Sequence, residues 1–204
     1  MLKDIFYQLV TGYSTNGELA ENLWQEIENK YSVDRYYHNL DHLENMYLHL
    51  KEVKTMILNW DTVLFALFYH DIIYHAADET NEIKSAEIAI ARLSAIGFPK
   101  LQIDKCKEII LATKSHIASE DFEVNYFTDV DLSILGHQWE VYFSYAQNIR
   151  KEYSIYPDLI YTAGRKKVLR HFLEMTRIYK TSFFYDKFEI TARENLAREL
   201  AMPG

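Results

Sequence analysis

Helical periodicity constrains the fold of this chain more than any other feature of its sequence. Apolar residues recur at every third or fourth position along most of its length, the spacing that places them on one face of an α-helix. No segment alternates apolar and polar residues beside a hairpin turn signal. The sequence therefore predicts an all-α fold, a helical bundle of about eight to ten helices around one core. The clearest stripes are Leu19, Leu23, Trp24 and Ile27 in residues 17–32, and Ile83, Ala86, Ile90 and Leu93 in residues 81–98.

The remaining predicted helices are joined by short polar or Gly- and Pro-marked segments. With only 3 Pro and 6 Gly in 204 residues, no low-complexity linker and no internal repeat, the chain is predicted to form one domain over residues 1–204. The further helices are expected at 39–57, 61–73, 101–115, 125–135, 138–153, 158–175 and 186–201.

Charge and apolar content exclude two classes of partner. A net charge of −8 disfavours binding to a nucleic-acid polymer, although a locally positive site for a small anion remains compatible with it. The longest apolar stretch, Val63 to Tyr69, is far shorter than the roughly 20 residues of a membrane span, so no membrane is expected. The single cysteine, Cys106, forms no internal disulfide, and no apolar leader precedes Lys3 and Asp4, so a cytoplasmic location is expected. The oligomeric state is left open.

His70 and Asp71 stand side by side inside an apolar run. The segment from Asp61 to Tyr74 is apolar on nearly every side, which predicts a central buried helix. A buried carboxylate must neutralise, find a partner or bind a metal, and a metal ion beside the helix would satisfy both side chains. The alternative is a hydrogen-bonded core histidine followed by an aspartate that caps a broken helix.

His38 and His42 form a second candidate pair, four residues apart. If a helix begins near Asn39, His42 lies in its first turns and His38 lies just before it, over the same face. Alone, such a pair is more often a surface or capping pair than a metal site.

A further carboxylate is expected near residue 130. Asp131 shares a helix face with Phe127 and Leu135, whereas Asp129 shares one with polar neighbours. Asp131 is therefore predicted to be the buried carboxylate that needs a partner, either a metal or an arginine such as Arg150 or Arg165.

Together, His42, His70, Asp71 and Asp131 form a candidate metal site drawn from three predicted helices. Imidazole and carboxylate ligands suit divalent Zn, Mn, Fe, Ni or Co, and a set without cysteine is more typical of a catalytic site, with open positions for water and substrate, than of a structural zinc site.

The motifs "YHNLDHLENM", "FYHDIIY", "NEIKSAEIAIARLSAIG" and "DVDLSILG" resemble, in this order, those of a branch of predicted hydrolases in the HD superfamily of metal-dependent phosphohydrolases. The resemblance runs from about residue 35 to 136. It implies that His42, His70, Asp71 and Asp131 ligate a divalent metal, with Mg added to the ions named above. His38 and Asp129 are the alternates should the alignment be off by one motif position.

The resemblance also implies hydrolysis of a phosphoester of a nucleotide or another small phosphate compound by metal-activated water. In this reading Asp71 or Glu82 orients the water, and His116 or Lys114 stabilises the departing charge. Substrate-binding residues would be Arg35, His38 and Lys114, although Arg35 and Lys114 are equally compatible with ordinary surface positions.

Two alternatives stay open. HD proteins with two metals place a histidine where this chain has Glu82, so a second metal, and with it an HD-fold di-iron oxygenase, would depend on Glu82 and His116 as ligands. The other alternative is a non-catalytic module that binds a nucleotide or a metal.

Overall fold

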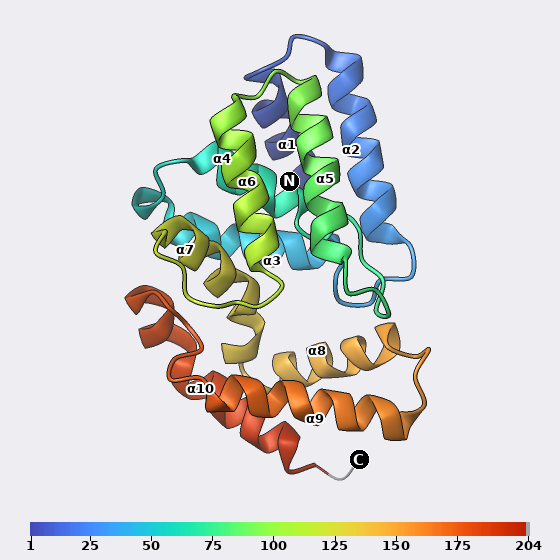
Figure 1. Cartoon of the computed structure of the whole chain (residues 1–204), viewed down its shortest axis with the longest axis vertical. Helices are drawn as coiled ribbons and strands as arrows, with labels where there is room; N and C mark the ends of the chain where they lie inside the picture. The colour runs from blue at the N-terminus through green and yellow to red at the C-terminus, as the bar shows by residue number, and fades with distance from the viewer. Residues whose placement is uncertain (203–204) are drawn as a thin grey trace. The chain divides into compact units, whose positions relative to one another are not determined.

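The computed structural model describes residues 1–202, and within them it contains helices and turns but no strand (Figure 1). The predicted all-α class is confirmed. The described part of the chain contains ten α-helices and two short 3₁₀ helices, at the upper end of the predicted number. Tertiary contacts divide the chain into two units, Met1–Ile117 and Ala118–Gly204. A single domain over residues 1–204 stays a prediction.

The first unit is built around α4 (Trp60–Tyr69). Residues 62–69 are all buried, and α4 packs against α3, α5 and α6. A helix that is apolar on every side requires such surroundings, because no side of it can face water. The other elements of this unit are α1 (Leu2–Thr11), α2 (Gly17–Ser32), α3 (Leu40–Glu52), η1 (Lys54–Met56), α5 (Asn81–Ala95) and α6 (Lys100–Ala112).

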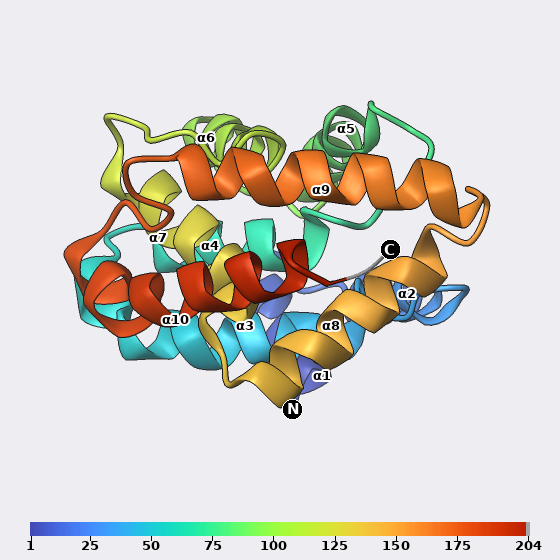
Figure 2. The same cartoon turned by 90° about the horizontal axis from the view of Figure 1, so that it is seen from below.

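The second unit consists of α7 (Phe122–Asp131), η2 (Leu132–Gly136), α8 (Trp139–Glu152), α9 (Asp158–Glu174) and α10 (Ser182–Leu200). Helix α10 packs against both α9 and η2, and Figure 2 shows α9 and α10 side by side. A largely buried ion pair joins these two helices. Nε and Nη2 of Arg165 donate to the two carboxylate oxygens of Glu199, at 2.8 and 2.9 Å.

Two predictions about helices need correction. Helix α1 was not predicted, although Leu2, Phe6 and Leu9 have helical spacing and are all buried. In α5 the predicted stripe is partly wrong, since Ile83 is 45% exposed. The buried face of α5 instead consists largely of small side chains such as that of Ser85. These small side chains allow α5 to lie close to α6.

Among residues 1–202, no helix has both the length and the apolarity that crossing a bilayer requires.

Candidate metal centre

Asn39 fixes the position of His42. The Asn39 side-chain oxygen accepts hydrogen bonds from the backbone N–H groups of Asp41 and His42, at 2.9 and 3.2 Å, and so caps α3. The helix begins at Leu40, which confirms the predicted start near Asn39. His42 therefore lies in the first turn of α3, where its side chain is buried.

His70 terminates α4, which ends earlier than the predicted limits of residue 73 or 74. Its backbone N–H donates to the Ala66 carbonyl, and its ring Nδ1 lies 3.0 Å from the carbonyl oxygen of Leu67. A carbonyl oxygen can only accept, so Nδ1 carries the proton of this hydrogen bond. With Nδ1 as the donor, Nε2 is the ring nitrogen that faces the Asp71 carboxylate and that a metal ion would bind.

The two histidines lie together within the first unit. The ring centroids of His42 and His70 are 5.5 Å apart, and those of His42 and His38 are 5.8 Å apart. His38 itself stacks on the ring of Tyr74, with a centroid separation of 4.0 Å. The two helices thus bring together two buried imidazoles with a third at their edge, as the sequence predicts for His42 and His70.

One ring nitrogen of His42 and one of His70 lie within 4.8 Å of each other. Imidazole nitrogens at this spacing are ligands of the kind that a divalent metal ion binds. Asp71, another predicted ligand, lies beside this pair, with its Oδ2 3.1 Å from Nε2 of His70. This places a largely buried carboxylate oxygen beside the ring nitrogen that would bind a metal ion.

Arg35 braces the turn that carries His70 and Asp71. Its Nη1 donates to the carbonyl oxygens of His38 and Asp71, at 3.2 and 2.6 Å, and its Nη2 donates to that of Ile72 at 3.0 Å. The guanidinium also lies over the rings of Tyr31 and Tyr74. These contacts give Arg35 a positioning role that the sequence did not predict; its binding to substrate stays a prediction.

We expect Arg35→Gln to weaken divalent metal binding by about tenfold or more, because loss of groups that orient metal ligands commonly has this effect. Isothermal titration with Mn²⁺ measures the change. Arg150→Gln is the matched control, since Arg150 also donates to two turn carbonyls, those of Tyr153 and Tyr156, in the second unit. Equal metal affinities of the two variants would contradict the positioning role of Arg35.

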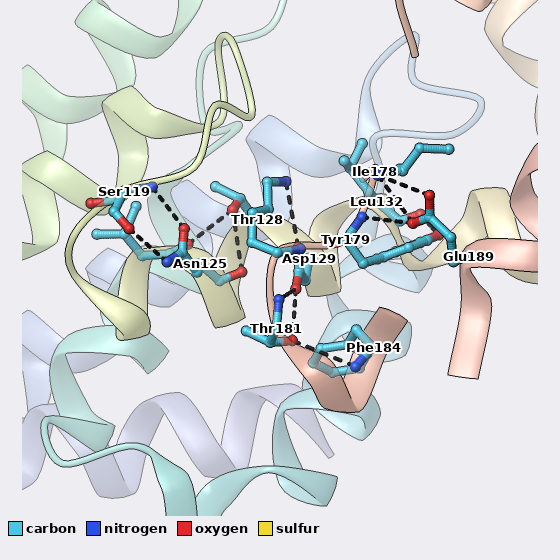
Figure 3. A network of polar contacts seen from close by, with 12 residues as sticks. Ser119, Asn125, Thr128, Asp129, Leu132, Ile178, Tyr179, Thr181, Phe184 and Glu189 are labelled. Carbon is cyan, nitrogen blue, oxygen red and sulfur yellow. Dashed lines mark hydrogen bonds and ion pairs between the residues drawn. The ribbon is translucent and has the colours of Figure 1, made fainter. Parts of the chain in front are cut away.

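The sequence predicts that Asp131 is more buried than Asp129, and the structure shows the opposite. Asp129 is fully buried and Asp131 is only half-buried. The carboxylate of Asp129 accepts hydrogen bonds from the backbone N–H groups of Lys180 and Thr181 and from the Thr181 hydroxyl, all at 2.7–2.8 Å (Figure 3). Burial raises the pKa of Asp129, and these contacts oppose the increase.

These bonds give Asp129 a structural role. They do not support Asp129 as the alternate metal ligand. The predicted arginine partners of Asp131 are engaged elsewhere, since Arg150 pairs with Asp158 and Arg165 with Glu199. Asp131 as a metal ligand stays a prediction, and the reason for it, greater burial than Asp129, was wrong.

The remaining predicted residues lie at the edges of the first unit. Glu82 is in the first turn of α5, where its Oε2 is shielded from solvent and accepts no hydrogen bond from residues 1–202. Nζ of Lys114 donates to the Glu79 carbonyl at 2.6 Å. His116 follows α6 in a left-handed conformation, with φ of 52°. No contact in the structure assigns a catalytic role to Glu82, Lys114 or His116, so these roles stay predictions.

Comparisons of this chain with protein-family models, with curated proteins and with solved structures found no match. The resemblance to the HD superfamily therefore stays a prediction that rests on the sequence motifs.

Proposed function

We propose that this protein is an HD-type metal-dependent phosphohydrolase that cleaves a phosphoester of a nucleotide or another small phosphate compound. The observation that carries the proposal is the pair of buried imidazoles of His42 and His70, with the carboxylate of Asp71 3.1 Å from Nε2 of His70. Its support is the tautomer of His70, in which the hydrogen bond to the Leu67 carbonyl directs the Nε2 lone pair away from the backbone.

The donor set fits a divalent transition metal. Two imidazole nitrogens and a carboxylate oxygen suit Zn, Fe, Ni, Co or Mn better than Mg, which prefers a shell of oxygen atoms. His42, His70 and Asp71 would hold the ion, and Asp131 would be the fourth ligand that the resemblance to the HD superfamily implies. A set of three or four protein ligands leaves coordination positions for water and substrate, as catalytic sites require.

A bound divalent ion would supply Lewis-acid activation of water and of a phosphoryl oxygen at neutral pH. Asp71 is the residue best placed to orient the attacking water and receive its proton, because its carboxylate lies 3.1 Å from the proposed ligand nitrogen of His70. Glu82 is the second candidate for this task.

The position of Glu82 follows from its neighbour Ser85, three residues further along α5. The hydroxyl of Ser85 donates to the carbonyl oxygen of Ile73 and accepts from its N–H group, so this face of α5 is tied to the turn after Asp71. Residues three apart share a helix face, which directs Glu82 toward the same side. Its shielded Oε2 has the capacity to accept a hydrogen bond from a water molecule.

Metal content and phosphatase activity test the proposal together. We expect protein purified without chelators or metal-affinity resin to contain about one transition-metal ion per chain by plasma mass spectrometry, and to hydrolyse members of a panel of nucleotides and small phosphomonoesters. The Asp71→Asn variant removes the proton acceptor with little change in size, and we expect its kcat to fall by at least about a hundredfold.

Other outcomes assign other functions. Two iron ions per chain would favour the di-iron oxygenase. One metal ion without turnover of any phosphoester would favour a binding module, and no metal uptake after incubation with Mn²⁺, Ni²⁺, Co²⁺, Fe²⁺ or Zn²⁺ would leave His70 and Asp71 with a structural role.

A further inference from the structure

Three helices of the second unit line a cavity of about 410 Å³. Its walls come from the C-terminal part of α8, the first half of α9 and the end of α10, which lie at the same end of the three helices (Figure 2). Pockets that bind small organic molecules commonly have volumes of about 300–1,000 Å³. None of the lining residues is a predicted metal ligand, so the cavity is separate from the candidate metal centre in its residues.

Arg165 and Glu199 form a largely buried ion pair in the wall of this cavity. Their side chains are 11% and 13% exposed, and two hydrogen bonds join them, at 2.8 and 2.9 Å. Glu199 also accepts a hydrogen bond from the Tyr142 hydroxyl. The carboxylate thus neutralises Arg165 and already has three donors.

The second arginine of the cavity wall, Arg150, is engaged in the same way. Its Nε and Nη2 donate to one carboxylate oxygen of Asp158, at 3.1 and 2.6 Å. Its Nη1 and Nη2 also donate to the backbone carbonyls of Tyr153 and Tyr156. The two arginines and the two carboxylates of the cavity therefore compensate one another in charge.

Lys166 is the remaining cation that lines the cavity. Its side chain on α9 is half-buried, and within residues 1–202 no carboxylate pairs with its ammonium group. The cavity thus carries an uncompensated positive charge, although the whole protein has a net charge of −8. A cation that is partly withdrawn from water is stabilised by an anionic ligand, because the ligand restores the interactions that water supplied.

The rest of the wall is largely apolar. Leu169 and Ala146 are 1% and 8% exposed, and Phe143, Tyr161 and Met202 add further apolar surface. Covering such a wall with an aliphatic chain removes apolar area from water, which favours binding.

We infer that this cavity binds a small carboxylic acid with an aliphatic body. Its carboxylate accepts hydrogen bonds from the ammonium group of Lys166, and its chain packs against Leu169 and Met202. A monoanion matches the single uncompensated charge. A doubly charged phosphate would instead bring a second negative charge toward Asp158 and Glu199, which line the same cavity.

Octanoate and octanamide test the inference, because they have the same chain and nearly the same shape but differ in charge. In isothermal titration of the metal-free protein, we expect octanoate to bind at a single site about tenfold or more tightly than octanamide, since it accepts a hydrogen bond from a charged group. Lys166→Met should weaken octanoate binding by about tenfold and leave octanamide binding unchanged. Lys167→Met, the same change at an exposed neighbour on α9, is the matched control and should bind both compounds like the unmodified protein.

A second pair of variants tests the location of the site. Thr162→Phe fills the cavity and should weaken the binding of both compounds, whereas Ala163→Phe adds the same ring at an exposed position of α9 outside the cavity and should not. Thermal unfolding shows whether each variant is folded. No binding of octanoate, equal affinities for octanoate and octanamide, or equal octanoate affinities of Lys166→Met and Lys167→Met would overturn the inference. These results do not depend on the proposed phosphohydrolase activity, because the protein in these titrations holds no metal.

Discussion

We expect the His70→Ala variant to lose bound metal, with an affinity for Mn²⁺ at least about a hundredfold below that of the unmodified protein. Removing a group that only orients a metal ligand costs 10- to 100-fold in affinity, so removing a ligand should cost more. His70 is an informative position because its Nδ1 is engaged by the Leu67 carbonyl, which leaves Nε2 as its ligand atom. Metal content by plasma mass spectrometry and titration calorimetry measure the change.

A control must separate lost coordination from lost packing, since the His70 side chain is buried. His70→Gln retains a polar side chain of similar length, and its thermal stability and helical content show whether the variant still folds. His171→Ala, an exposed histidine on α9, should keep full metal content. Normal metal content in a folded His70→Gln protein would exclude His70 as a ligand and remove the main support for the phosphohydrolase.

The second large effect is expected on stability, from Asp129→Ala in the metal-free protein. This change removes the acceptor of two backbone N–H groups and a hydroxyl, and leaves the buried ammonium of Lys180 without its ion-pair partner (Figure 3). Breaking a buried ion pair by removing one partner costs about 3–5 kcal/mol in the free energy of unfolding. Urea unfolding followed by circular dichroism measures this difference.

Asp158→Ala provides the comparison, because Asp158 pairs with Arg150 while its side chain is 88% exposed. Exposed ion pairs contribute at most about 1 kcal/mol, so this variant should remain close to the unmodified protein in stability. Adding Lys180→Met to Asp129→Ala should recover part of the loss, since it removes the uncompensated charge. Equal stabilities of Asp129→Ala and Asp158→Ala would contradict the structural role assigned to Asp129.

The candidate site shows which structural features the sequence predicts correctly and which it does not. Local signals placed His42 correctly, because the Asn39 cap and the helix that follows involve only neighbouring residues. They failed at the end of α4, where the apolar run continues past Tyr69 but the helix does not. Hydrophobic periodicity reports which residues avoid water, and it does not show where a buried helix gives way to a turn.

Asp129 and Asp131 show what local sequence signals cannot predict. Helix spacing assigned the wrong carboxylate to the interior, because the partners of Asp129 are about 50 residues away, at Lys180 and Thr181. The burial of Lys180 beside α7 depends on the same long-range contact, and the sequence around Lys180 does not predict it. Arg35 is a third case, because it donates hydrogen bonds to the carbonyl oxygens of Asp71 and Ile72, which lie 36 and 37 positions further along the chain.

The sequence by itself determined the all-α class, most of the helices and the position of His42 in the first turn of its helix, because helical spacing and capping depend on neighbours within about four residues. Only the tertiary structure decided the tautomer of His70, the brace by Arg35 and the separation of Asp129 from Asp131 in role. Each of these depends on which hydrogen-bonding groups meet, and burial makes an unmet donor or acceptor costly enough to fix the arrangement.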